Sequence, residues 1–381
     1  MRVLSAIWIA RVPCLAFVVI GLFWGSFAAS VPDLKARLGV GDAVFGLLLV
    51  ANGVGLVAAM WAAPVLDRWL SARSLQAVVA CFACAIALPA FASTPGIFLA
   101  SMVCVGFFSG LSDILMNARV SELEASHARP LMNSAHGMFS VAYAVAALYT
   151  GFFRDAAQPP EVTLLFTATL CLLIATRLYA PIGTAEDDSV AGELPPTFPW
   201  RIVLMSGAIV LVAFMSEATV ETWSALHIER TLGGDPLAGA IGPLMLGLTM
   251  AVGRFSGQAV SERFADHQVI IAASLLSASG AVIAALAPSP AWAYLGFGTF
   301  GLGVSVIGPL GIALAGRLVR PRFRTEAISK TAVMGFSGFF IAPVFMGGVS
   351  EVAGLRVAYL GVACLVLMAI VLVISLRRIT A

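Results

Sequence analysis

Long apolar runs separated by short polar segments dominate the sequence. Each run covers about 20 residues, the helix length needed to cross a hydrocarbon core about 30 Å thick. Twelve such runs occur, at 12–31, 44–64, 75–92, 96–118, 131–152, 161–180, 201–221, 237–258, 269–288, 292–314, 329–350 and 355–376. They lack the alternation of a membrane β-barrel, and in lipid the backbone polar groups must be satisfied within the segment. The pattern therefore predicts an all-α integral membrane protein with twelve transmembrane helices.

The basic residues are distributed unevenly between the two sides of this predicted topology. Of the 22 Lys and Arg residues, five fall on one side, namely Lys35, Arg37, Arg154, Arg230 and Arg356. The other seventeen lie on the side that holds both termini. Because positively charged loops stay in the cytoplasm, this bias predicts a multi-pass protein of a bacterial-type inner membrane with both termini cytoplasmic. Basic residues here set topology, so no nucleic-acid partner is expected.

The longest polar segment separates the sixth and seventh apolar runs. It covers residues 181–199 and is rich in acidic residues and proline. It divides the chain into an N-terminal six-helix bundle (1–180), a cytoplasmic linker (181–199) and a C-terminal six-helix bundle (200–381). The division predicts two related halves.

A short charged sequence recurs in these halves. Asp67 and Arg68, followed by an aromatic residue, come after the second apolar run. Glu262 and Arg263, again followed by an aromatic residue, come after the eighth run at an offset of 195 residues. The offset is close to half of the chain, so we interpret the two copies as traces of a duplication.

Ionisable residues inside the apolar runs are the best pointers to function, because an unpaired charge in hydrocarbon is costly. In the fourth run, Asp113 and Asn117 are four residues apart and share one helix face. In the fifth run, His136 and Ser140 are related in the same way. Counting the rise of the helices places Asp113, Asn117 and His136 at similar depth, in the cytoplasmic half of the membrane.

This placement has two interpretations. A low dielectric favours the neutral carboxyl, so Asp113 could exchange a proton that His136 shares or relays. The alternative is a structural hydrogen-bond network that ties the fourth and fifth helices together.

The second half offers fewer candidates. Glu217 lies about 24 Å from the cytoplasmic end of the seventh helix and could line a cavity. Glu221 and Trp223 are expected at the membrane interface, where Trp is common. Arg254 lies near the cytoplasmic end of the eighth helix and is expected to snorkel in a structural role.

The whole organisation resembles the major facilitator superfamily. The loop signature of that superfamily is roughly G-x-x-x-D-R-x-G-R, and Asp67, Arg68 and Arg73 keep its charges, whereas Ala63 and Leu70 replace glycines. The resemblance implies two pseudo-symmetric six-helix bundles that rock about a central site.

The same resemblance implies gating residues. Asp67 and Arg68, and in the weaker second copy Glu262 and Arg263, would lock the cytoplasmic side in one state. The alternative is that these charges only orient their loops.

Within the superfamily, Asp113 and Asn117 look like the fucose permease-like branch. The rhizopine-transport-like group of that branch (MosC and YbjJ type) is the one most similar to the fuller set of Asp113, Asn117, Glu122 or Glu124, His136, Ser140, Glu217, Trp223 and Ser224. This resemblance implies proton-coupled movement of a sugar-, polyol- or inositol-like solute, with Asp113 as the protonatable group and Asn117 as a solute partner. The acid that the fucose permease pattern has late in the first helix is absent here, so a two-carboxylate scheme does not transfer intact.

Two further residues are candidates for solute contact. Trp24 could stack on a sugar ring, and Asn52 lies in the middle of the second run. Helix packing is the alternative for both residues.

Together these features predict a secondary transporter for a small hydrophilic solute, with protons and membrane lipid as further partners and, by resemblance, a monomer. A proton-driven exporter of amphiphilic or drug-like compounds is the alternative, and it would need a large aromatic cavity that selects cations. The sequence contains no P-loop, paired metal ligands or serine-hydrolase motif, so no cofactor, metal or enzymatic activity is expected.

Overall fold

The computed structural model describes residues 2–179, 198–261 and 263–380, and within these ranges the chain is helical with no strand. The elements, in chain order, are α1 (Arg2–Ile9), α2 (Arg11–Leu38), α3 (Asp42–Leu70), η1 (Ser71–Arg73), α4 (Ser74–Ala85), η2 (Leu88–Phe91), α5 (Pro95–His127), α6 (Met132–Asp155), α7 (Pro160–Ala175), α8 (Trp200–Leu226), η3 (His227–Thr231), α9 (Pro236–Ser261), α10 (Asp266–Leu286), α11 (Pro290–Leu318), η4 (Pro321–Phe323), α12 (Arg324–Phe336) and α13 (Gly338–Thr380).

The helices match the predicted membrane crossings. In the part of the chain that the structure describes, nine helical stretches are long and apolar enough to cross a membrane, and Pro160–Ala175 is a shorter apolar helix. Two of the nine, Asp42–Phe91 and Glu326–Ile379, are 50 and 54 residues long. Each is too long for one crossing and reverses at a residue with positive φ, Ser71 (51°) or Gly354 (82°). The expected all-α fold class is therefore confirmed, and these described stretches are consistent with the twelve expected crossings.

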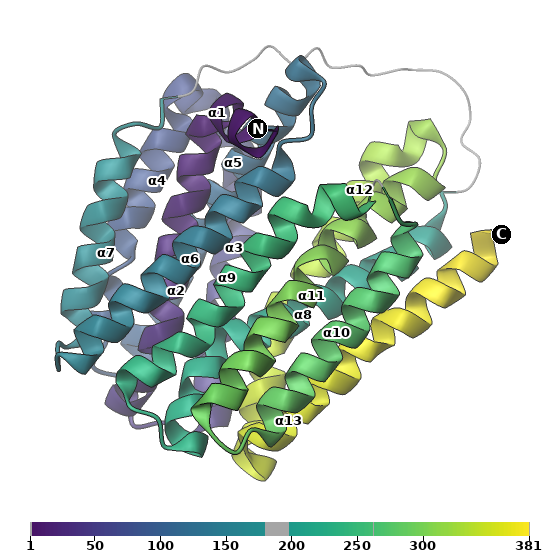
Figure 1. Cartoon of the computed structure of the whole chain (residues 1–381). Coiled ribbons are helices and arrows are strands. Elements are labelled where there is room, and N and C mark those ends of the chain that lie inside the picture. Colours follow the sequence, from purple (N-terminus) through teal and green to yellow (C-terminus); the bar gives the residue numbers. More distant parts are fainter. Residues whose placement is uncertain (1, 180–197, 262, 381) are drawn as a thin grey trace.

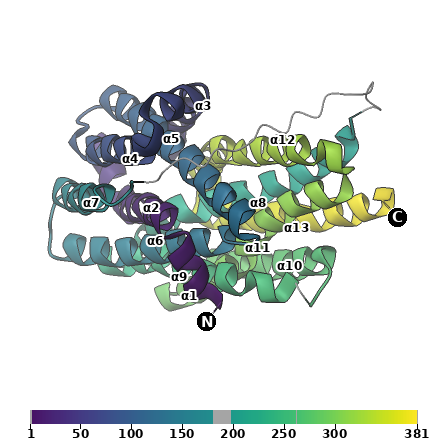
Figure 2. The same ribbon diagram turned by 90° about the horizontal axis from the view of Figure 1, so that it is seen from above.

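The helices form two groups that lie side by side (Figures 1 and 2). Helices α2 to α7 make one group and α8 to α13 the other, and we call them the N-terminal and C-terminal halves. The halves meet where α6 packs against α9, α3 against α13, and α2 against α8. Most of the predicted linker, 181–199, falls outside the described residues, so the domain boundaries stay a prediction.

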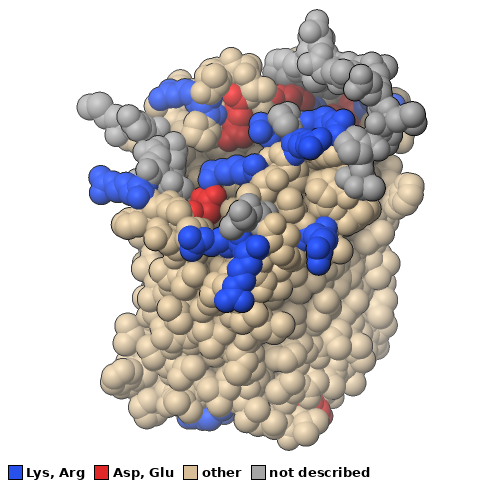
Figure 3. Space-filling view, turned by 90° about the vertical axis from the view of Figure 1, so that its right-hand side faces the viewer, with Lys and Arg blue, Asp and Glu red and all other residues tan. Residues whose placement is uncertain are grey.

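Both termini lie at the same end of the bundle, which we call the terminal end, and the opposite end is the far end (Figure 1). On the face shown in Figure 3, the basic side chains gather near the terminal end, whereas the flank below is almost free of charge. An uncharged flank is what lipid contact requires.

Close backbone contacts hold α2 against α6. A Cβ atom on Gly25 would lie 2.1 Å from the carbonyl oxygen of Tyr143, and one on Gly21 would lie 2.3 Å from that of Phe139. Small residues let membrane helices approach this closely. The contact places Phe139 and Tyr143 beside the first crossing, close to the centre of the molecule.

We expect Gly25→Ala to destabilise the protein by about 1–3 kcal/mol, because the added methyl meets backbone atoms that cannot rotate away. The measurement is the apparent melting temperature in detergent. Gly96→Ala is the matched control, since a Cβ there meets nothing within 4 Å. A melting temperature that falls equally for both variants would contradict this account of the α2–α6 contact.

Candidate functional site

A buried arginine joins three helices at the centre of the molecule. Arg254 of α9 donates from Nη2 to Oε1 of Glu217 on α8 at 2.7 Å, and from Nη1 to Oγ of Ser140 on α6 at 2.5 Å. Arg254 is 9% exposed and Glu217 is 6% exposed. The guanidinium also lies over the Phe139 ring, 5.7 Å from its centroid. One ion pair in the C-terminal half is thus hydrogen-bonded to the N-terminal half.

The expectation of a snorkelling Arg254 is wrong. A snorkelling side chain would end in the headgroup region, whereas this guanidinium turns inward and neutralises Glu217. A buried carboxylate needs such a partner, because an unpaired charge in a low dielectric is strongly destabilising. Glu217, which the sequence identified, is therefore part of a charged centre between the halves.

The segment after Glu217 also differs from the expected membrane interface. Trp223 is fully buried, and its ring packs edge-on against Phe45 of α3, with centroids 6.1 Å apart. The backbone carbonyl of Glu221 accepts a hydrogen bond from the hydroxyl of Tyr143 at 3.2 Å. The distal part of α8 therefore packs against the N-terminal half and does not form part of an aromatic belt.

Asp113 and Asn117 contact each other on α5, as their spacing predicts. Asn117 Nδ2 donates to Asp113 Oδ1 at 3.2 Å and to the Asp113 carbonyl oxygen at 2.8 Å. Both residues are half-buried. His136 lies on α6, and its ring packs edge-on against Phe17, 4.7 Å between centroids. Among the described residues no hydrogen bond or ion pair joins Asp113 to His136.

The structure places the other candidates for solute contact in different surroundings. Ser140 donates to the carbonyl oxygen of His136 at 3.1 Å and accepts from Arg254. We call the hydrogen-bonded set of Arg254, Glu217 and Ser140 the central bridge. Trp24 packs edge-on between Phe23 and Phe27. Asn52 is half-buried on α3, and its Oδ1 has no partner among the described atoms.

The candidate gating residues lie at the terminal end, and those described make no bond to the opposite half. Asp67 accepts from Arg119 at 2.6 Å and from Ser74 at 2.5 Å, both in its own half. Arg68 and Arg263 are exposed. Glu262 lies outside the described residues.

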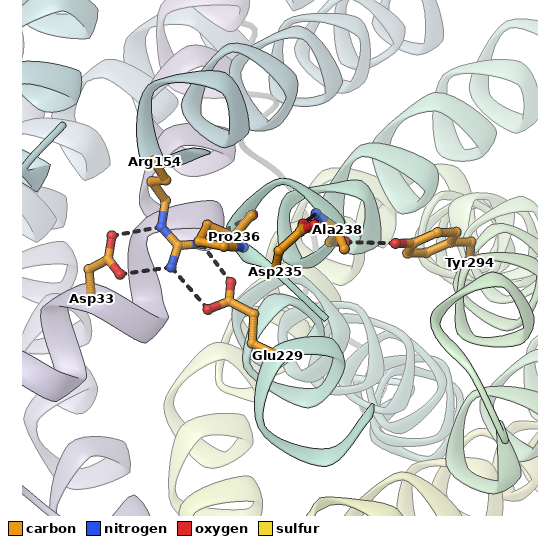
Figure 4. A network of polar contacts seen from close by, with 7 residues as sticks. All are labelled: Asp33, Arg154, Glu229, Asp235, Pro236, Ala238 and Tyr294. Carbon is orange, nitrogen blue, oxygen red and sulfur yellow. Dashed lines mark hydrogen bonds and ion pairs between the residues drawn. The ribbon is translucent and has the colours of Figure 1, made fainter. Parts of the chain in front are cut away.

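Two ion-pair clusters fasten the halves at the far end. In the first, Arg154 of α6 lies between Asp33 of α2 and Glu229 of η3 (Figure 4). It donates to Asp33 at 2.6 and 2.7 Å and to Glu229 at 2.6 and 3.0 Å. Arg154 is 5% exposed. The guanidinium is therefore bidentate to both carboxylates, one from each half.

The second cluster is centred on Asp42 at the start of α3. Its carboxylate accepts from Arg230 of η3 at 2.6 and 2.7 Å and pairs with Lys35 at 3.0 Å. Glu351 of α13 accepts from the backbone N–H of Asp42 at 2.5 Å, so an acid of one half caps a helix of the other. An open depression of about 590 Å³ lies here, lined by these four residues and others.

Polar contacts between the halves are confined to the centre and the far end. In the described ranges, hydrogen bonds cross between the halves at Asp42, Ala43, Ser140, Tyr143 and Arg154, and at none nearer the terminal end. Among the described residues, polar contacts therefore fasten the halves at the centre and at the far end. Within the same ranges, no group of three or more His, Cys, Asp or Glu side chains could hold a metal ion.

The far-end clusters were not predicted from the sequence, although the positions of two arginines indicated them. Arg154 and Arg230 were two of the five basic residues on the side where positive charge is rare. A basic residue that the charge rule does not explain needs another reason for its position. The positions of Asp33, Asp42 and Glu229 gave no comparable indication, because acidic residues contribute little to the positive-inside rule.

Comparisons with known proteins agree with this fold. A family model described as the Major Facilitator Superfamily matches residues 14–268 and 208–381. An uncharacterised MFS-type transporter of Yersinia pestis is 27% identical over 368 residues, covering 96% of this chain and 94% of that protein. The membrane protein MosC of Rhizobium meliloti is 26% identical over 348 residues, covering 90% and 84%. The crystal structure of a D-xylose–proton symporter is 12% identical, with a TM-score of 0.75 and coverage of 96% of each chain.

We expect Arg254→Met to lower the apparent melting temperature in detergent, because it leaves Glu217 buried without its counter-ion. Removing one partner of a buried pair costs about 3–5 kcal/mol. Adding Glu217→Gln to this variant should recover part of the loss. Arg320→Met, at an exposed arginine, is the matched control. If the double variant melts no higher than Arg254→Met alone, the two side chains do not neutralise each other.

Proposed function

The chain belongs to the major facilitator superfamily, and on this basis we propose that it carries a small hydrophilic solute across a bacterial inner membrane by alternating access coupled to protons. The predicted position near the MosC group is confirmed, since MosC itself is among the curated relatives. Membership of a transporter family also indicates a transporter and not an enzyme. A sugar, polyol or inositol-like compound is the solute class that we propose.

The central bridge carries this proposal. Arg254, Glu217 and Ser140 place charged and hydroxyl groups between two halves whose described polar contacts lie at the centre and the far end. Hydroxyl-rich solutes are recognised by such donors and acceptors, and buried ionisable groups inside a membrane protein mark solute and proton pathways. An interface between repeats, near the middle of the membrane, is where secondary transporters bind their solutes.

The candidate residues then have distinct roles. Asp113, His136 and Glu217 are proposed for proton coupling, and Asn117, Ser140, Trp24 and Asn52 for solute contact. The pair of Asp113 and Asn117 supports this division, because one carboxylate and one amide side by side can serve a proton and a hydroxyl.

The basic terminal end is proposed to face the cytoplasm. The Arg154 and Asp42 clusters would then join the two halves on the periplasmic side. The periplasmic gate consists of these two clusters. Asp67, Arg68, Glu262 and Arg263 belong to the cytoplasmic gate, where Asp67 and Arg119 hold the ends of α3 and α5 together.

The exporter alternative fits the centre less well. An exporter that selects lipophilic cations needs acids without a nearby positive charge in an aromatic cavity. Here Arg254 lies 2.7 Å from Glu217 and over the face of Phe139. The guanidinium occupies the position that such a cation would need.

The experiment reconstitutes the purified protein in liposomes with a pH-sensitive dye inside and adds D-xylose, myo-inositol and related sugars and polyols in turn. We expect at least one compound to move protons, and Asp113→Asn to abolish the signal. Asp155→Asn, at an exposed acid, is the matched control and should transport normally. Proton movement evoked only by lipophilic cations would refute the proposed solute class.

The periplasmic gate gives a separate prediction, because the described chain contains two bidentate arginine–glutamate pairs with the same distances, one buried and one partly exposed. Arg154 binds Glu229 across the halves and Arg37 binds Glu161 within one half, both at 2.6 and 3.0 Å. We expect Glu229→Gln to shift molecules toward the outward-open state, seen as faster hydrogen–deuterium exchange of η3 and the start of α9. Glu161→Gln should leave the exchange of these segments unchanged.

If both variants exchange alike, the Arg154 cluster is only a local brace and does not fasten the halves. Because both variants make the same chemical change at a bidentate arginine, the comparison separates loss of a gate contact from simple loss of an ion pair.

A further inference from the structure

Glu221 holds a position that the proposed roles leave unused. It lies on α8 one helical turn beyond Glu217, so the two acids share a face. Its side chain is half-buried, and its backbone carbonyl accepts from Tyr143 of the other half at 3.2 Å. Glu221 is therefore at the contact between the halves, next to the central bridge.

The bridge and the neighbouring Glu221 together contain one base and two acids. Arg254 is bonded to Glu217 and Ser140, and the charges of both Glu217 and Arg254 act on Glu221. The described residues provide no hydrogen bond or ion pair to the Glu221 carboxylate. When both acids are ionised, one negative charge is left without a partner in a region of low dielectric, and such a charge must be neutralised.

A second observation comes from the arginine. Nε of Arg254 is buried and has no hydrogen-bond partner among the described atoms, and the residue is only 9% exposed. A guanidinium carries five N–H donors, and the two bonds described here use only Nη1 and Nη2. Arg254 therefore has spare donors that a neighbouring acceptor could use if the side chain turned.

The other elements around α8 bring no further free charge to Glu221. Helix α6 brings the phenol of Tyr143, and α13 brings the phenol of Tyr359. In η3, His227 is bonded to the Ala284 carbonyl and Glu229 to Arg154. The charged residues of α2, α11, α12 and α13 lie near the ends of their crossings. Among the described residues, Glu217 and Arg254 are the charged groups that act on Glu221.

We propose that Glu221 is a further proton-binding group beside those already proposed for coupling, and that Ser140 determines when its proton is released by holding Arg254 away from Glu221. This deepens the proposed function and rests on it. Uptake forms one O–H bond on the carboxylate with a proton from water, and release breaks that bond. The site changes its charge by one and nothing is oxidised or reduced.

The fold links this step to the motion of the halves. Ser140 belongs to the N-terminal half, whereas Arg254, Glu217 and Glu221 belong to the C-terminal half. Separation of the halves at the centre breaks the bond from Arg254 to Ser140, and it also removes Tyr143 from the Glu221 carbonyl. The freed guanidinium can then contact both acids, and its charge expels the proton from Glu221.

Infrared difference spectroscopy tests this without knowledge of the solute. The purified full-length protein is taken through a pH titration in detergent, and the C=O stretching band of a protonated carboxyl is followed. We expect a titrating band that Glu221→Gln removes and that Asp113→Asn and Glu217→Gln retain. Glu221→Asp should keep the band with a changed frequency and midpoint, which guards against a variant that fails to fold.

Two results would overturn the proposal. One is that Glu221→Gln removes no titrating band, which would assign every titrating carboxyl to another residue such as Asp113. The other is loss of the wild-type band on addition of sodium chloride but not choline chloride, which would make Glu221 a cation ligand. Neither result changes the outcome of the liposome assay. Solute-evoked proton movement can therefore be observed there even if Glu221 is not a proton-binding group.

The role of Ser140 has its own readout. Ser140→Ala frees Arg254 to approach Glu221, so the midpoint of the Glu221 band should move to lower pH. Ser140→Thr keeps a hydroxyl and should restore the wild-type midpoint. Ser256→Ala is the control, since this serine bonds only to carbonyls of its own helix. An unchanged midpoint in Ser140→Ala would contradict the positioning role.

Discussion

An ionised side chain inside a membrane protein must have a partner, and the structure of this transporter depends on that constraint. Asp42, Arg119, Arg154, Glu217 and Arg254 are the buried Asp, Glu, Lys and Arg residues of the described chain, and each forms an ion pair. Leaving any of them alone would cost several kcal/mol. The buried pairs consequently fix how the helices that carry them are arranged.

The location of each pair decides what it contributes. The pair of Arg119 and Asp67 lies within one half and holds that half together in any state of the molecule. The Arg154 and Asp42 clusters cross between the halves, so the halves cannot separate at the far end unless new partners or water replace these contacts. Arg254 combines both arrangements, because its acid is in its own half and its hydroxyl partner is in the other.

A short π-helical turn serves both far-end clusters. Glu229 and Arg230 are adjacent in η3, yet one binds Arg154 and the other binds Asp42. Such turns are frequent at functional sites. Two neighbouring residues of opposite charge thus reach two different helices of the N-terminal half, and one movement of η3 would release both contacts.

Hydropathy and charge alone predicted the class of protein and its crossings. Apolar length determines which segments can cross a membrane, and the transfer of a helix into lipid is a local property, so the pattern is legible in the sequence. The contact of Asp113 with Asn117 was equally predictable, because a spacing of four places two residues on one helix face.

Contacts between helices were not predictable in this way. Arg154 and Arg230 were visible as exceptions to the charge rule, but their partners are 75 to 188 residues away in sequence. Arg254 was assigned to the headgroup region because its depth along α9 allows that, and only packing shows that it turns inward to Glu217. The sequence by itself determined the membrane crossings, their helical form and the faces of single helices, since these depend on local free energies of transfer. The tertiary structure decided which charges meet, because pairing depends on the distance between helices that no local pattern encodes.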